Sequence, residues 1–260
     1  MKIILKTERD LEAMRPACLV ASNVLEEVSV FIQPGVSTRQ VDDYAASRIR
    51  HYGAKSAFLG YRKYPCNICI SVNDEVVHGL ANDRRLLFGD IVSLDVGVVF
   101  RGFIGDTART VAVGGCSLEA QRLMDVTDAA LYEGIGRAIP GNRVSDISRA
   151  VQNFVEGNGF SVVREFVGHG VGRTVHEEPQ VPNFVDSHTK DCRLQPGMTL
   201  AIEPMVNAGG PAVKILKDGW TAVTQDGSLS AHFEHTVLIT GSEPEILTCL
   251  EKVPSKLKVS

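Results

Sequence analysis

Four acidic residues of this chain lie in apolar, β-prone stretches, where an unpaired charge is costly. Asp95 and Asp106 belong to the first half of the sequence, and Glu203 and Glu234 belong to the second. A single acidic residue in such a position is often a solvated charge at a strand end. Four of them, drawn from both halves, favour a site in which carboxylates share protons or hold a cation.

The two aspartates are expected to face each other in one β-hairpin. The turn signal Arg101-Gly102 separates two β-branched runs, and a four-residue loop, 99–102, makes Asp95 directly oppose Asp106. Their Cβ atoms would then lie about 5 Å apart. Two ionised carboxylates at that separation repel each other, so this register favours a bound cation.

One of the seven histidines stands out by its neighbours. His169 lies among the glycines of Gly168–Gly172, so backbone or a ligand can approach it closely. Four carboxylates and one imidazole suit two divalent cations such as Mn²⁺, Fe²⁺, Co²⁺ or Zn²⁺, and such a pair generates hydroxide at neutral pH. The pattern therefore predicts a dinuclear metallohydrolase. We interpret four other histidines as ordinary core or surface residues: His51, His188, His232 and His235.

Two predicted helices open the chain. Thr7 is a cap for a helix that ends near Phe31, and Pro34-Gly35 breaks it. Ser37 or Thr38 then caps a second helix, which Gly53 can end.

The same order returns 106 residues later. Ser117 starts a long helix, Pro140-Gly141 breaks it, Ser145 is predicted to cap the next helix, and Gly159 can end that one. This second copy indicates an internal repeat.

The strands repeat as well. Gly89 and Gly197 each precede a β-rich run that reaches one of the carboxylates six residues later. We infer one α+β domain over 1–260, built from two pseudo-twofold-related halves of about 1–115 and 116–260. Its helices would cover a curved antiparallel sheet, with a site fed by both halves on the open face.

The composition narrows the function classes. The chain has 260 residues, of which 44% are hydrophobic and 22% charged, and its net charge is −4. These values exclude a disordered chain and do not suggest nucleic acid or membrane as a partner. The six cysteines are scattered, the pair Cys66 and Cys69 lacks a second pair for a zinc ribbon, and no signal peptide is evident. We therefore expect reduced thiols in a cytoplasmic protein.

Five short runs of the sequence are similar to those of a known family. They are Cys69–Asn73, Gly105–Arg109, Gly168–Gly172, His176–Pro179 and Pro196–Pro204. With them, the chain resembles the type I methionine aminopeptidases in their short bacterial form, from Leu5 to about Leu247. The resemblance implies the pita-bread fold, whose two pseudosymmetric halves agree with the repeat.

The resemblance also implies a role for each candidate ligand. Asp95 would hold one metal, and His169 and Glu203 the other. Asp106 and Glu234 would bridge the two divalent cations.

The same resemblance implies the catalytic groups. Glu203 would act as general base for hydroxide bridged by the metals, which attacks the scissile carbonyl. His176 would hydrogen-bond the carbonyl and its oxyanion, and His78 would contact the scissile amide. Four residues would line the pocket for the methionine side chain: Tyr61, Tyr64, Cys69 and Trp220. Phe58 and Val175 depart from the family pattern, which leaves the outline of that pocket open.

The function implied is removal of the initiator methionine from nascent proteins whose second residue is small and uncharged. We expect a monomer with transient ribosome contact at most. Two alternatives stay open. One is a proline-directed peptidase related to prolidase, although those relatives usually carry a further N-terminal domain. The other is a binding protein on the same fold that has lost its metals, although all five expected ligands are present.

Overall fold

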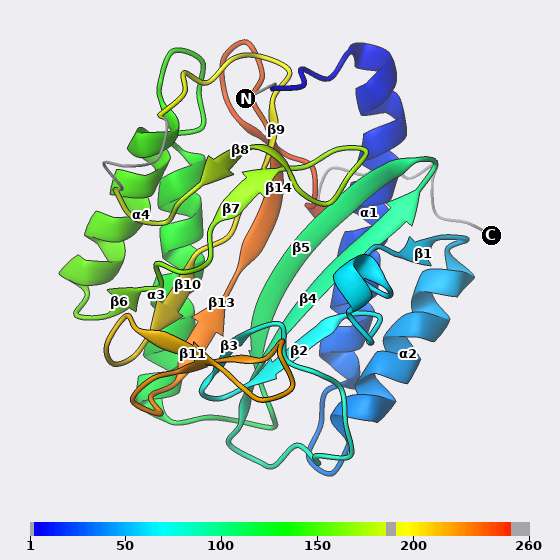
Figure 1. The fold of residues 1–260 in the computed structure, drawn as a ribbon, viewed down its shortest axis with the longest axis vertical. Coiled ribbons are helices and arrows are strands. Elements are labelled where there is room, and N and C mark those ends of the chain that lie inside the picture. The colour runs from blue at the N-terminus through cyan, green and yellow to red at the C-terminus, as the bar shows by residue number, and fades with distance from the viewer. Residues whose placement is uncertain (1–2, 186–190, 251–260) are drawn as a thin grey trace.

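The computed structural model describes residues 3–185 and 191–250. His188 lies outside the described residues. One large antiparallel sheet dominates the molecule, and helices cover one of its faces (Figure 1). The predicted α+β architecture is confirmed. Within the described residues, no helix combines the length and apolar character needed to cross a membrane.

Four α-helices and one short 3₁₀ turn are present in the described chain. They are α1 (Glu8–Phe31), α2 (Thr38–His51), α3 (Leu118–Ile135), α4 (Val144–Gly157) and η1 (Tyr61–Lys63). Helix α1 packs against two strands of the sheet, β4 (Ile91–Phe100) and β5 (Phe103–Ala112), and against α2, and α3 packs against α4 (Figure 1).

The large sheet has the strand order β1-β4-β5-β14-β9-β7-β8, with β2 also paired to β4 and β15 to β14. Its strands are β1 (Lys55–Ser56), β2 (Cys69–Val72), β4 (Ile91–Phe100), β5 (Phe103–Ala112), β7 (Gly168–Gly170), β8 (Glu177–Val181), β9 (Thr199–Ile202), β14 (Glu234–Leu238) and β15 (Glu245–Ile246). The central pair β5 and β14 joins a strand of the first half to one of the second.

Two small three-stranded sheets flank the large one. One has the order β13-β10-β6 and the other β11-β12-β3. Their strands are β3 (Glu75–Val77), β6 (Ser161–Val162), β10 (Met205–Asn207), β11 (Val213–Ile215), β12 (Ala222–Thr224) and β13 (Ser230–His232).

The predicted helix starts are confirmed for three of the four helices. Thr7 and Asp10 form a reciprocal capping box at α1, Ser37 caps α2 and Ser117 caps α3. Each side-chain oxygen satisfies a backbone N–H that has no partner within its helix.

The predicted cap of α4 is wrong. Arg143, not Ser145, is the N-cap residue, and its backbone N–H donates to Asp146 Oδ2 at 2.9 Å. Ser145 lies within the first turn, where its hydroxyl donates to Asp191 Oδ2 at 3.0 Å. The chain is held at this point by a β-bridge between Arg143 and Arg193, which fixes where the helix begins.

The internal repeat is visible in the backbone of the two helix-breaking turns. Gly35 and Gly141 both have φ of 90°, a conformation that glycine adopts without steric cost. Each donates its N–H to an equivalent carbonyl, Gly35 to Leu86 at 2.8 Å and Gly141 to Leu194 at 3.2 Å. The two turns therefore make the same contact in each half.

The predicted register of the aspartate hairpin is wrong by two residues. The turn between β4 and β5 holds two residues, Arg101-Gly102, with φ of 52° and 79°. Such a turn matches the twist of the paired strands better than the expected four-residue loop. Asp95 therefore pairs with Ala108, and Asp106 pairs with Gly97. The aspartates still share one face, because alternate residues of a strand point the same way, but they are diagonal neighbours.

Candidate metal centre and its cavity

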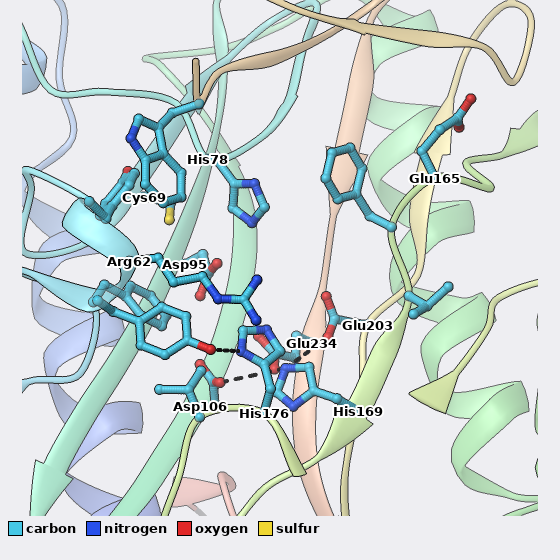
Figure 2. A pocket seen from close by; sticks show the side chains of 17 residues that line it. Arg62, Cys69, His78, Asp95, Asp106, Glu165, His169, His176, Glu203 and Glu234 are labelled. Carbon is cyan, nitrogen blue, oxygen red and sulfur yellow. Dashed lines mark hydrogen bonds and ion pairs between the residues drawn. The ribbon is translucent and has the colours of Figure 1, made fainter. Parts of the chain in front are cut away.

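The five predicted ligands come from five neighbouring strands of the large sheet. Asp95 lies on β4, Asp106 on β5, Glu234 on β14, Glu203 directly after β9, and His169 on β7. Figure 2 shows these side chains directed into one space on the face of the sheet opposite the helices. The antiparallel pairing brings together residues that lie far apart in the sequence.

The donor atoms are close enough to share a cation. His169 Nε2 lies 3.3 Å from Glu203 Oε1 and 4.0 Å from Asp106 Oδ2. One ligand atom from each of Asp106, His169 and Glu234 lies within 4.8 Å of the other two. Two ligands bound at about 2 Å from one ion lie at most about 4 Å apart, so the separations of His169 from Glu203 and Asp106 suit a shared cation.

Several buried polar atoms at this centre make no hydrogen bond. Among the described residues, four buried side-chain atoms lack any hydrogen bond: Asp95 Oδ1, Asp106 Oδ1, Glu203 Oε1 and His232 Nε2. Buried polar atoms are normally satisfied, and a cluster of unsatisfied carboxylate oxygens is the donor set that a divalent cation requires. The residues present therefore fit a metal centre.

The protein environment makes uncompensated charge here expensive. Burial, with nearby carboxylates, raises the pKa of Asp106, Glu203 and Glu234 well above their usual range, and burial raises the pKa of Asp95 to about 7. A bound cation would compensate the negative charge of these four carboxylates.

His169 is prepared to act as a neutral ligand. Burial, with a smaller contribution from the nearby His176, lowers the pKa of His169 to about 3. Its Nδ1 lies 2.9 Å from the carbonyl oxygen of Gly170, which leaves Nε2 directed at the carboxylates. A carbonyl on one ring nitrogen fixes the tautomer in which the other nitrogen can bind a metal.

A cavity of about 310 Å³ opens above the ligands. Every residue to which a role was assigned from the sequence lines it, and so do Phe58 and Val175. It is also lined by four residues that the sequence did not single out: Arg62, Glu165, Phe166 and Val167.

The two predicted catalytic histidines lie on different walls of this cavity. His176 Nδ1 is 2.9 Å from the Tyr61 hydroxyl, and its ring centroid is 4.3 Å from that of His169. His78 has φ of 61°, rare for a residue other than glycine, and its ring meets Phe166 edge-on at 5.2 Å. Burial lowers the pKa of His78 to about 4, so its imidazole is neutral.

An aromatic recess adjoins the metal ligands. The Tyr64 and Trp220 rings pack edge-to-face at 5.0 Å, and the Tyr64 hydroxyl donates to the Gly79 carbonyl at 2.8 Å. Phe58 covers the backbone of β4, where a Cβ on Gly97 would lie 2.4 Å from its ring. The absence of a side chain at Gly97 therefore allows Phe58 to form part of this wall.

His232 is a site residue that the sequence interpretation missed. The sequence interpretation treated it as an ordinary core or surface residue. It is buried, and its Nε2 lies 3.8 Å from Glu203 Oε2. The available signal was its position two residues before Glu234, because alternate residues in extended chain point to one side.

Comparison with known proteins identifies the family. The sequence pattern of metallopeptidase family M24 matches residues 12–241. The chain belongs to this family. As an M24 protein it is an enzyme, a hydrolase of peptide bonds.

Individual relatives agree with the predicted resemblance. The chain is 49% identical over 246 residues to methionine aminopeptidase 1 of Bacillus subtilis (strain 168), covering 95% of this chain and 99% of the relative. The solved structure of methionine aminopeptidase from Rickettsia prowazekii matches with a TM-score of 0.93 at 39% identity, covering 95% of this chain and 100% of that one. The resemblance to methionine aminopeptidases is thus confirmed.

The fold extends to more distant M24 structures. Prolidase from Pyrococcus furiosus matches with a TM-score of 0.79 at 23% identity, covering 96% of this chain and 66% of that one. This likeness confirms the predicted pita-bread fold.

Proposed function

We propose that this enzyme removes the initiator methionine from new polypeptides whose second residue is small. The observation that carries the proposal is the contact between the candidate metal centre and a recess of aromatic side chains, within one cavity of about 310 Å³. The relative from Bacillus subtilis, matched over 99% of its length, is named a methionine aminopeptidase. We further expect a monomer that meets its substrates in the cytoplasm.

We assign the metal ligands as the resemblance implies. Asp95 would hold one divalent cation, His169 and Glu203 would hold a second, and Asp106 and Glu234 would contribute to both. When bound, such cations act as Lewis acids and make water a nucleophile at neutral pH. Mn²⁺, Fe²⁺, Co²⁺ and Zn²⁺ all accept this mixture of oxygen and nitrogen donors.

The side chains around the ligands would guide the reaction. Glu203 takes the proton of the attacking water as general base. The Tyr61 hydroxyl lies 2.9 Å from His176 Nδ1. In the tautomer in which this hydroxyl donates to Nδ1, the neutral imidazole carries its proton on Nε2 and would donate it to the scissile carbonyl oxygen. His78, on another wall, contacts the scissile amide.

The recess would hold the side chain of the first residue. Tyr64 and Trp220 provide flat apolar walls, and the Cys69 sulfur is a polarisable contact for a thioether. An unbranched side chain of methionine's length should fit, whereas leucine, branched one carbon earlier, should fit less well. One misplaced methylene is worth only about 1–3 kcal/mol, so this selection is finite.

The second residue is limited by the two histidines. Its side chain must pass close to His78 and His176 as the carbonyl approaches the metal centre. We therefore propose that alanine, glycine and serine are accepted there and that bulky residues are rejected.

The test is a panel of peptides varied at the first and second positions. The protein is first treated with a chelator and then reloaded with Mn²⁺ or Co²⁺. We expect cleavage of Met-Ala-Ser and Met-Gly-Ser after reloading, weak cleavage of Met-Phe-Ser, and no cleavage of Ala-Pro peptides. Efficient Ala-Pro cleavage would favour a prolidase-like activity, and full activity in the chelated sample would exclude metal dependence.

A further inference from the structure

Arg62 brings a positive charge into the cavity from a tightly constrained turn. Its backbone lies at φ 47° and ψ 27°, and Lys63 follows with φ of 74°. The turn is closed by two backbone hydrogen bonds, from Gly60 N–H to the Tyr64 carbonyl at 2.8 Å and from Lys63 N–H to the Gly60 carbonyl at 3.1 Å. Left-handed backbone at non-glycine residues is costly and tends to occur where a side chain has a task.

The guanidinium lies beside a proposed catalytic histidine. It lies 5.4 Å from the centre of the Tyr61 ring, whose hydroxyl meets His176. Figure 2 shows Arg62 extending across the cavity toward His176. Burial and the Arg62 charge both lower the pKa of His176, in agreement with this proximity.

The charge of Arg62 is available to a ligand. Across residues 3–185 and 191–250, no carboxylate lies within ion-pair distance of Arg62. Its side chain is exposed, unlike the metal ligands at the floor of the cavity. A rim arginine without a fixed partner can pair with an acidic group of a bound substrate, often through two parallel hydrogen bonds.

The opposite wall carries the opposite charge. Glu165 is exposed and lines the same cavity, on the other side from Arg62 (Figure 2).

If the first residue occupies the aromatic recess and the scissile carbonyl meets His176, the rest of the peptide must leave past the rim of the cavity. Extended chain rises about 3.3 Å per residue, so the third residue lies about 7 Å from the first. Arg62 lies beside His176, which would meet the scissile carbonyl, so the third side chain would leave the cavity on the side of Arg62.

We propose that Arg62 is a specificity-determining residue that favours peptides with an acidic third residue. The inference rests on the proposed function, because it needs the direction in which the peptide lies. The pair forms at a solvent-exposed rim, so its effect on turnover is moderate and sensitive to salt.

The experiment compares peptide amides of the form Met-Ala-Xaa-Ser with Glu, Gln or Lys at Xaa. The amide removes the terminal carboxylate, which would otherwise also attract Arg62. We expect the metal-loaded enzyme to have a kcat/KM about threefold to tenfold higher for Glu than for Lys at low salt. Arg62→Gln should bring this ratio close to one, and Arg62→Glu should invert it. The matched control is Lys63→Gln, which removes a neighbouring cation that does not line the cavity and should leave the ratio unchanged.

A binding measurement separates this inference from the proposed function. Trp220 is the only tryptophan of the chain and lines the cavity, so its fluorescence reports peptide binding without turnover. Titration of chelator-treated protein should show the same order of affinity, Glu above Gln above Lys, lost in Arg62→Gln.

Three outcomes overturn the inference. If the Glu-to-Lys ratio of kcat/KM is the same in the wild type and in Arg62→Gln, then Arg62 does not select the third residue. The proposed function would be unaffected by this result. A ratio lost equally in Lys63→Gln would assign the effect to general surface charge. Failure of the wild type to cleave any peptide would overturn the proposed function and this inference with it.

Discussion

The proposed mechanism gives Glu203 two roles, metal ligand and general base. One oxygen faces His169 Nε2 at 3.3 Å, as a ligand of a shared cation would, and the other lies 3.8 Å from His232 Nε2. The side chain is largely enclosed, with 13% of its surface exposed. A carboxylate so placed can contribute to metal binding with one oxygen while the other handles a proton.

Glu203→Gln should separate these roles. We expect kcat to fall about 10²- to 10⁴-fold, because an amide cannot act as general base, while its remaining carbonyl oxygen still supports some metal binding. Metal content measured beside kcat is the check. A variant with full metal and more than a tenth of the wild-type kcat would show that Glu203 is not the base.

His176→Ala should affect the transition state more than substrate binding. An oxyanion donor acts mainly when charge develops on the carbonyl oxygen, so we expect kcat to fall about 10²- to 10³-fold with little change in KM. Tyr61→Phe, which removes the hydroxyl 2.9 Å from His176 Nδ1, should give a smaller loss in kcat. A normal kcat with a higher KM in His176→Ala would make the residue a substrate anchor instead.

At the scale of elements, the strands decide which residues meet. The acidic residues and His169 could be found from the sequence, because charges in apolar β-prone runs are conspicuous. The residues that face them on the neighbouring strands could not be predicted. They depend on the hairpin register, which changes with whether the turn at Arg101-Gly102 holds two or four residues. Arg62 was missed for a similar reason, since an exposed arginine in a loop has no sequence pattern that places it in a cavity.

A buried ion pair holds the segment that carries His176. Lys6 Nζ lies 2.6 Å from Glu177 Oε2, with 4% and 5% of their side-chain surfaces exposed. Glu177 Oε1 also accepts the backbone N–H of Arg173 at 2.8 Å. The N-terminal segment is thereby tied to the residue next to His176.

Lys6→Met should leave the Glu177 charge buried without its partner. We expect the free energy of unfolding to fall by about 3–5 kcal/mol, measured by urea denaturation, and much of the loss to return in Lys6→Met/Glu177→Gln. The matched control is Arg39→Met, which breaks an exposed pair with Asp83 and should leave the unfolding free energy almost unchanged. Equal losses in both single variants would contradict a special role for the buried pair.

A second pair joins helices α1 and α2 and should respond to pH. Glu27 accepts hydrogen bonds from Tyr52 at 2.8 Å and from Arg48 at 3.1 Å. Burial alone would raise the pKa of Glu27, but these bonds outweigh it and lower the pKa below 4.5. The lowered folded-state pKa means that the stabilisation is present above the unfolded pKa and is lost as the pH falls through the folded value.

The pH test uses Glu27→Gln. We expect the difference in unfolding free energy between wild type and variant to be constant near about pH 6 and to shrink toward about pH 3, as Glu27 becomes protonated in the wild type. Urea midpoints across this range provide the measurement. A difference that stayed constant or grew on acidification would show that Glu27 gains nothing from its charge in the folded state.

At the scale of the whole molecule, the candidate metal centre joins the two halves of the repeat. Asp95 and Asp106 come from the first half, and His169, Glu203 and Glu234 from the second. Without cations, the carboxylates repel one another across the line where β5 meets β14. The site therefore lowers the stability of the metal-free chain at the point where its halves meet, and a bound cation would reverse this.

Metal loading should consequently stabilise the entire fold, not only the site. At a free Mn²⁺ concentration of about 100 times Kd, we expect the unfolding free energy to rise by about 2.7 kcal/mol, and a chelator to remove the gain.

Asp106→Asn should have opposite effects on the stability of the metal-free and the metal-loaded protein. It relieves repulsion and stabilises the metal-free protein, yet it weakens the response to Mn²⁺. Asp128→Asn, which changes a partly buried acid of α3 outside the catalytic cavity, is the control and should keep the full response. The measurement is the thermal unfolding midpoint with and without Mn²⁺. If Mn²⁺ raises the midpoint equally in Asp106→Asn and the wild type, the cation does not bind between the halves.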